Sequence, residues 1–134
     1  MSKEQTSQRP RVLVVDDDET ILAKATQMLE QLGYETATAS SGWDAVTRLD
    51  TTRPDLILLD ITMQPLDGFK TLTLIRASKE GFADIPVAML SSHDDVFNIG
   101  KARSLGCSAY LEKPLELQEL KAVLRELLTV RAVG

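Results

Sequence analysis

An unbroken apolar run that ends in a carboxylate, Leu56–Leu59 followed by Asp60, limits the folds that are open to this chain. The run is too short for a helix, and it is bounded by the turn residues Pro54 before it and Pro65 and Gly68 after it. Such a run predicts a strand buried on both faces, as in the middle of a parallel sheet. Because ligands of open parallel sheets bind at the carboxyl ends of the strands, Asp60 is predicted to lie at a functional edge. When Asp60 is considered alone, a turn or the cap of the next helix explains it equally well.

Apolar segments of two periodicities alternate along the rest of the chain. Four further strands are predicted, at residues 11–15, 34–39, 87–90 and 109–111. Helical spacing predicts five helices: Asp18 to Leu32, Ser40 or Ser41 to about Leu49, Gly68 to Arg76, Asp94 or Asp95 to Leu105, and Leu117 to Leu128. In the second helix, Trp43, Val46 and Leu49 are expected to face inward. Five strands that alternate with five helices predict an α/β fold, a doubly wound parallel sheet covered on both faces.

Length and composition describe one ordinary domain. The 134 residues divide into a domain at 11–129, a polar and disordered tail at 1–10, and a short tail at 130–134. No apolar stretch is long enough for a membrane span, and the N-terminus lacks the apolar core of a signal peptide. The net charge of −5 argues against direct binding to nucleic acid. The single cysteine, Cys107, suits a reducing environment, so a cytoplasmic location is expected.

Polar side chains gather where the predicted strands end. They are Asp16, Asp17, Asp60, Ser91 and Lys113. Carboxylates in one crevice repel each other, each close pair by about 1–4 kcal/mol, so a cation is expected beside them. Lys113 is one candidate, and Mg²⁺ is the other, because it prefers oxygen ligands from carboxylates, waters and phosphate. A carboxylate next to Mg²⁺, a hydroxyl and an ammonium group is suited to accepting a phosphoryl group, with Asp60 as the nucleophile.

These motifs resemble the receiver domain of bacterial two-component response regulators, of the chemotaxis-regulator type. The resemblance covers about residues 11–128 and is specific, because its motifs occur in order. They are Val-Val-Asp-Asp at 14–17, Pro-Asp-Leu-Ile-Leu-Leu-Asp at 54–60, Asp-Gly at 67–68, Ser91 and Lys-Pro at 113–114. The resemblance implies a flavodoxin-like sheet with the strand order 2-1-3-4-5.

The resemblance also implies a role for each acidic residue. Asp60 corresponds to the phosphoacceptor of the family, and Asp16 and Asp17 correspond to the acidic pair that binds Mg²⁺. The backbone carbonyl of Thr62 corresponds to a further metal ligand, beside the carboxylate of Asp60. Mg²⁺ is therefore the expected cofactor.

Other site residues are assigned in the same way. Ser91 matches the hydroxyl that hydrogen-bonds the phosphoryl group, and Lys113 matches its ion-pair partner. Ser91 and Tyr110 together match the aromatic switch of the family. The resemblance further implies a cis peptide bond before Pro114.

Three positions depart from the family pattern. Receivers usually have Met-Pro where this chain has Met63-Gln64, so the loop after the acceptor is expected to differ, with Pro65 one place late. Ser91 replaces the commoner threonine, and its hydroxyl can make the same hydrogen bond. Trp43 is a bulky residue near the start of the second helix, interpreted as a packing residue. The segment 90–97, with the later Gly106, is faintly similar to receivers of the twitching-motility pathway.

The implied function is that of a stand-alone phosphoacceptor rather than a conventional enzyme. A histidine kinase or a histidine phosphotransfer domain would supply the phosphoryl group, and the chain itself would catalyse its transfer to Asp60 and its later hydrolysis. Phosphorylation would then switch a surface that binds a downstream output protein. No direct contact with nucleic acid or membrane is expected.

Three other functions fit parts of the sequence pattern. Asp16, Asp18 and Thr20 also fit the Asp-x-Asp-x-Thr motif of haloacid-dehalogenase-like phosphatases, with Asp16 as nucleophile and Asp18 as acid and base. That reading lacks a later acidic motif and leaves Asp60 unexplained. A second alternative is a receiver-like interaction module that no longer takes phosphate. A flavodoxin is disfavoured, because the loop after the first strand is acidic where a flavin phosphate needs donors.

Overall fold

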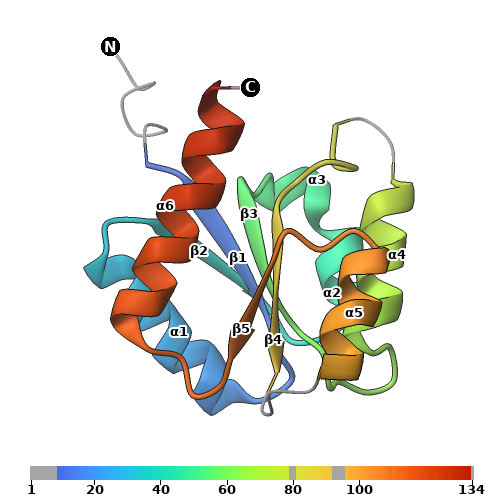
Figure 1. Cartoon of the computed structure of the whole chain (residues 1–134). Helices are drawn as coiled ribbons and strands as arrows, with labels where there is room; N and C mark the ends of the chain where they lie inside the picture. The colour runs from blue at the N-terminus through green and yellow to red at the C-terminus, as the bar shows by residue number, and fades with distance from the viewer. Residues whose placement is uncertain (1–8, 79–80, 92–95, 134) are drawn as a thin grey trace.

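The computed structural model describes residues 9–78, 81–91 and 96–133. In this part of the chain, five parallel strands form one sheet in the order β2-β1-β3-β4-β5 (Figure 1). The strands are β1 (Arg11–Val15), β2 (Glu35–Ala39), β3 (Leu56–Asp60), β4 (Val87–Ser91) and β5 (Ala109–Glu112). The predicted fold class and strand order are therefore confirmed.

Helices cover both faces of the sheet. They are α1 (Glu19–Gln31), α2 (Gly42–Thr47), α3 (Leu49–Thr52), α4 (Gly68–Ala77), α5 (Val96–Ser104) and α6 (Leu117–Val133). Helices α1 and α6 lie on one side of the sheet, and α2 to α5 lie on the other (Figure 1). Among the described residues, no helix combines the length and the hydropathy that a membrane span requires.

The core consists of two layers, one on each face of the sheet. Side chains of a strand alternate between the faces, so Val12 and Val14 pack with α1 and α6, whereas Leu13 and Val15 pack with the helices on the other face. All five residues of β3 are buried, which confirms the central strand that the apolar run predicted. Burial on both faces holds the end of this strand, Asp60, in a fixed place.

The structure corrects the number of helices. The single helix expected to end near Leu49 is two helices, α2 and α3, so six helices are described rather than five. The break is at Arg48, whose φ of −104° and ψ of 11° lie outside the helical region. The N–H of Thr52 donates to the carbonyl of Arg48, and so do the hydroxyl groups of Thr51 and Thr52, at the end of α3. The short helix α3 is therefore closed onto the residue at which α2 ends.

The structure also corrects the orientation of Trp43. Its side chain is 53% exposed, although it was expected to face inward. The inward face of α2 starts one residue earlier, at Gly42, where an added Cβ would lie 2.1 Å from Oγ1 of Thr71 and 2.9 Å from Cδ2 of Leu66. Helix α2 is packed so closely against α4 that only glycine fits there. A neighbouring residue in a helix points about 100° away, which turns Trp43 to the surface.

Two structural features lie near the ends of the described chain. The carbonyl of Pro10, which was assigned to the N-terminal tail, accepts a hydrogen bond of 2.9 Å from the N–H of Glu35. Helix α6 continues to Val133, past residue 129. The residues expected to begin the fourth predicted helix, Asp94 and Asp95, lie outside the described residues.

One arginine ties together the end of the domain opposite to Asp60. Arg76, in the last turn of α4, donates from Nε to the carbonyl of Gly106, 2.9 Å away, in the turn between α5 and β5. Its Nη1 donates to the carbonyls of Ala83 and Ile85, at 3.0 and 2.7 Å, in the connection between α4 and β4. Burial lowers the pKa of the Arg76 guanidinium, against the opposing charge of Asp84.

Candidate phosphoryl-transfer site

Three carboxylates meet at the carboxyl ends of the two central strands. Strands β1 and β3 are hydrogen-bonded neighbours, with Val15 beside Leu59, so the residues that follow come together. One carboxylate oxygen from each of Asp16, Asp17 and Asp60 lies within 4.8 Å of the others. Asp16 and Asp60 are buried, 1% and 3% exposed, and Asp17 is exposed. The structure thus brings together all three acidic residues that the sequence predicted.

Lys113 reaches this cluster from the carboxyl end of β5, an edge strand of the sheet. Its Nζ lies 3.0 Å from Oδ2 of Asp16 and 3.0 Å from Oδ1 of Asp60. The backbone N–H of Lys113 donates to the carbonyl of Ser91 across 2.6 Å, which fixes the start of the loop after β5. The peptide bond before Pro114 is cis, as the family resemblance implied, and so is the bond between Gln64 and Pro65. The pairing of Lys113 with Asp16 was not predicted from the sequence.

The charges of the cluster shift the pKa values of its members. Burial raises the pKa of Asp60 to about 6, and the hydrogen bond from Lys113 limits the rise, while the negative charge of Asp16 adds to it. For Lys113, burial acts to lower the pKa, but the hydrogen bonds to Asp60 and Asp16 outweigh it and the pKa is raised. Lys113 therefore carries its positive charge at neutral pH, and the buried carboxylates need it.

Asp18 has a different role from its two neighbours. Its side chain accepts a hydrogen bond of 2.9 Å from the N–H of Thr20 and caps the N-terminus of α1. Its own N–H donates to Oδ1 of Asp16 at 3.0 Å, which orients that carboxylate toward the cluster. Asp18 is exposed and occupied as a cap, so the geometry does not favour it as the acid and base of a phosphatase.

The loop after β3 is built closely around the backbone of Asp60. The N–H of Thr62 lies 3.4 Å from Oδ1 of Asp60, and the N–H of Gly68 donates to the carbonyl of Ile61 at 2.8 Å. A Cβ on Gly68 would lie 2.3 Å from the carbonyl oxygen of Asp60 and 2.7 Å from Cα of Ile61. The Asp-Gly motif signalled this glycine, but sequence analysis gave no reason for it. The reason is that α4 begins in contact with the backbone of Asp60 and Ile61.

Ser91 and Tyr110 lie on the neighbouring strands β4 and β5. Ser91 is the last residue of β4, pairs with Glu112 in the register, and is 6% exposed. Tyr110 packs against the core layer formed with α2 to α5. Its hydroxyl is buried and has no hydrogen-bond partner among the described residues. His93, two residues after Ser91, lies outside the described part of the chain.

The cluster fits a hard divalent cation. Three carboxylates from two adjacent strand ends present only oxygen donors, two of them buried and one at the surface. Mg²⁺ prefers such a site, in which a few carboxylates bind it and water or phosphate oxygens complete its shell. The arrangement of one ammonium group and three carboxylates also leaves an excess of negative charge that a cation would balance.

Comparison with known proteins identifies the class to which this fold and site belong. Residues 12–125 match the family described as response regulator receiver domain. The chain belongs to this family, whose members accept phosphoryl groups in two-component signalling and bind Mg²⁺ at an acidic cluster. Receiver domains interact with histidine kinases and with downstream effectors.

Two curated relatives differ in length. The protein PilG of Pseudomonas aeruginosa is 38% identical over 122 residues, which cover 91% of this chain and 90% of PilG. The transcriptional regulatory protein PrrA of Mycobacterium leprae is 42% identical over 122 residues, which cover 91% of this chain but 51% of PrrA. The chain thus spans nearly all of one relative and about half of the other.

Solved structures of receivers have the same fold. The chemotaxis protein CheY4 of Vibrio cholerae superposes with a TM-score of 0.83 at 26% identity, over 89% of this chain and 98% of that one. The receiver domain of the sensor histidine kinase PA1611 from Pseudomonas aeruginosa superposes with a TM-score of 0.82 at 27% identity. The superposition covers 90% of this chain and 98% of that one. That receiver holds a magnesium ion coordinated in its active site cleft.

Proposed function

We propose that Asp60 is the residue of this chain that accepts the phosphoryl group. The observation that carries the proposal is the contact of its carboxylate with Lys113, 3.0 Å away, inside a cluster with Asp16 and Asp17. Asp60 is the member of this cluster on the central strand, and its backbone is held by burial on both faces and by the close approach of Gly68. A nucleophile that is fixed in this way loses little entropy on reaction.

The reaction is a transfer from phosphohistidine on a partner protein. A carboxylate oxygen of Asp60 attacks the phosphorus atom, the new P–O bond forms, and the P–N bond breaks with its electron pair passing to the imidazole nitrogen. The nucleophile must be ionised, and with a pKa of about 6 the carboxylate of Asp60 is ionised at neutral pH. Lys113, which contacts that carboxylate, lies within reach of an oxygen of the transferred group and offsets its charge.

Asp16, Asp17, Asp60 and the backbone carbonyl of Thr62 would hold Mg²⁺. The ion, when bound, neutralises the charge of the carboxylates and of the transferred oxygens. The buried carboxylate of Asp16 is oriented by the N–H of Asp18, and the exposed carboxylate of Asp17 closes the cluster toward solvent. These two residues therefore set the place of the cation relative to Asp60.

The response to phosphorylation passes through Ser91 and Tyr110. Ser91 ends the strand next to β3, where its hydroxyl can donate to an oxygen of the phosphoryl group. The carbonyl of Ser91 binds the N–H of Lys113, so a shift of Ser91 also moves the end of β5. Tyr110 lies on β5, and its buried hydroxyl, which has no hydrogen-bond partner among the described residues, would gain one by turning outward. The two residues together would switch a surface that binds an output protein.

The partners follow from this chemistry. The phosphoryl donor is a histidine kinase or a histidine phosphotransfer domain, and the acceptor of the signal is a downstream protein. A cytoplasmic location is consistent with the single reduced cysteine, Cys107.

The test is incubation with acetyl phosphate and Mg²⁺, followed by measurement of the intact mass. The wild-type chain gains the mass of one phosphoryl group, and Asp60→Asn gains none. Asp18→Asn is the matched control, since it changes one neighbouring carboxylate that caps a helix, and it gains the same mass as the wild type. Labelling that persists in Asp60→Asn and disappears in Asp16→Asn would contradict the proposal and favour a phosphatase-like nucleophile.

A further inference from the structure

Strand β2 is an edge of the sheet, and the backbone groups of two of its five residues face away from β1. The N–H of Glu35 donates to the carbonyl of Pro10, and the carbonyl of Ala39 accepts from the N–H of Asp16, so these two residues turn toward β1. Backbone groups of successive residues in a strand point to opposite sides. The N–H and carbonyl groups of Thr36 and Thr38 therefore point to the free side of the sheet.

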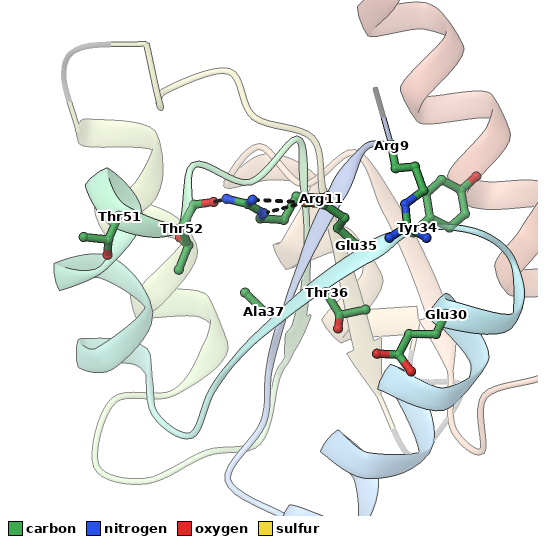
Figure 2. A pocket seen from close by; sticks show the side chains of 9 residues that line it. All are labelled: Arg9, Arg11, Glu30, Tyr34, Glu35, Thr36, Ala37, Thr51 and Thr52. Atoms are coloured by element: carbon green, nitrogen blue, oxygen red, sulfur yellow. Dashed lines mark hydrogen bonds and ion pairs between the residues drawn. The ribbon is translucent and has the colours of Figure 1, made fainter. Parts of the chain in front are cut away.

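Open space lies along this edge. A hollow of about 590 Å³ is lined by Thr36 and Ala37 of β2 and by residues on both sides of the strand (Figure 2). In that view Tyr34 and Glu30 lie on one side, and Arg11, which donates to the carbonyl of Thr52, lies on the other. A second hollow of about 460 Å³ is lined by Thr38 and α1. A strand edge that the described residues leave largely open is a template for pairing with another chain.

One side chain closes part of this edge. Nη1 of Arg48 donates to the outward carbonyl of Thr38 across 2.7 Å. The guanidinium also forms an ion pair with Asp44, one helical turn earlier, at 3.4 Å. Arg48 is the residue at which α2 ends and α3 begins, and its side chain reaches β2 from that junction. The contact is a charge-assisted hydrogen bond between a helix break and an edge strand.

We propose that Arg48 protects the edge of β2 and prevents it from pairing with β2 of a second copy of this chain. With the carbonyl of Thr38 occupied, only the groups of Thr36 and the N–H of Thr38 are available on the described edge. The two outward-facing residues could pair β2 with β2 of a second copy in an antiparallel arrangement, with Thr36 of one copy opposite Thr38 of the other. In that arrangement the Thr38 carbonyl of each copy accepts a hydrogen bond from the other copy, and Arg48 already occupies this carbonyl in each copy.

A second copy is the occupant that the geometry favours. The edge is short, with two outward residues, and the antiparallel arrangement about a two-fold axis uses the same two residues on both sides. It would extend the sheet across both molecules and bring the two hollows beside β2 into the contact. The chain carries a net charge of −5, so two copies repel each other over their whole surfaces. The contact of Arg48 with Thr38 opposes pairing at the edge of β2 itself.

The test compares Arg48→Met with Arg103→Met. Arg103 is exposed on α5, far from β2 in the sheet order, and its substitution changes the net charge by the same amount. The molar mass is measured by light scattering at several protein concentrations without metal. Arg48→Met is expected to form a dimer whose share rises with concentration, while the wild type and Arg103→Met remain monomers. Arg48→Ala, which removes the side chain altogether, should give the same result.

A second substitution separates edge pairing from general loss of stability. The N–H of Thr36 faces away from β1, so proline at this position removes an outward donor without breaking the ladder to β1. The double variant Arg48→Met with Thr36→Pro is expected to return to the monomer. The proposal is overturned if Arg48→Met and Arg48→Ala stay monomeric at all concentrations. It is also overturned if the double variant associates as strongly as Arg48→Met, because the association then does not use the edge.

Discussion

The ammonium group of Lys113 lies 3.0 Å from a carboxylate oxygen of Asp16, a residue 97 positions earlier in the chain. The contact means that the lysine neutralises Asp16 as well as the proposed acceptor, Asp60. A cation that entered the acidic cluster would therefore meet charge that is already partly balanced. We expect the lysine and Mg²⁺ to compete for the same carboxylates, and this competition can be measured.

Substitution of Lys113 by alanine should strengthen the binding of Mg²⁺. Loss of one positive charge beside two buried carboxylates increases the attraction for a divalent ion, by about tenfold in the dissociation constant. Titration calorimetry at pH 8, where Asp60 is ionised, measures the affinity. Lys24→Ala is the control, because Lys24 is an exposed lysine on α1 outside the cluster. Equal or weaker binding in Lys113→Ala would show that the lysine does not oppose the metal.

Asp17→Asn should abolish the effect of Mg²⁺ on thermal stability. Asp17 is the exposed member of the cluster, so its carboxylate can be removed without loss of buried contacts. The melting temperature without metal should change little, and the rise that Mg²⁺ produces in the wild type should disappear. Asp18→Asn carries the same charge change one residue away and keeps a cap for α1, so its response to Mg²⁺ should be retained. A normal response in Asp17→Asn would remove it from the metal site.

Asp60→Asn should stabilise the metal-free protein at neutral pH. Burial raises the pKa of Asp60 from 3.8 to about 6, so between these values the folded state keeps a proton that the unfolded chain has released. This contribution to stability is fully present below pH 3.8 and is lost as the pH rises through 6. Asparagine has no charge to bury, so the variant should gain about 2 kcal/mol above pH 7.

Urea denaturation with EDTA at several pH values measures this gain. It should shrink as the pH falls from 7 to 4. Asp50→Asn, a substitution of an exposed carboxylate on α3, provides a comparison and should change the free energy of unfolding little at any of these pH values. A gain in Asp60→Asn that is the same at pH 4 and pH 7 would rule out the raised pKa as its cause.

Two glycine substitutions should act in opposite directions. A Cβ on Gly68 would lie 2.3 Å from the carbonyl oxygen of Asp60, a backbone atom that cannot move aside, so Gly68→Ala should destabilise the fold by about 2–3 kcal/mol. Gly100 lies in α5, and among the described residues no atom beyond its own stretch of helix lies within 4 Å of the corresponding position. Gly100→Ala should therefore stabilise the protein by about 0.5–1 kcal/mol. Denaturant unfolding of both variants measures the difference, and equal effects would show that the loop after Asp60 can yield.

Most of the site could be predicted because each of its residues follows a strand. Asp16 and Asp60 come directly after or at the end of apolar runs, and the parallel sheet brings such positions to one edge. The same reasoning placed Lys113 there, and the structure confirms its contact with Asp60. The contact with Asp16 was missed, because it depends on how far a flexible side chain reaches across the intervening strands. Periodicity gives the position of a Cα atom but not the partner of a long side chain.

The errors in the sequence analysis lie where local packing decides between similar patterns. Trp43 and Gly42 are adjacent, and apolar spacing alone favoured the tryptophan as the inward residue. The contact of Gly42 with Thr71 of α4 decides otherwise, and it depends on a helix that lies far away in the sequence. The break at Arg48 was missed because threonine hydroxyls that donate back to a carbonyl, as those of Thr51 and Thr52 do, are common in continuous helices as well. The inward residue of α2, in contrast, depends on a neighbour that is close in space but distant in the sequence.

The hydrogen bonds of Arg76 distinguish the two ends of α4. Its guanidinium fixes the last turn of the helix to Gly106 on one side and to Ala83 and Ile85 on the other, while the first turn starts at Gly68, against the backbone of Asp60. We therefore expect a change at Asp60 that displaces Gly68 to move the first turn of α4 more than the last turn. The anchored end would then act as a fixed reference for the rest of the domain.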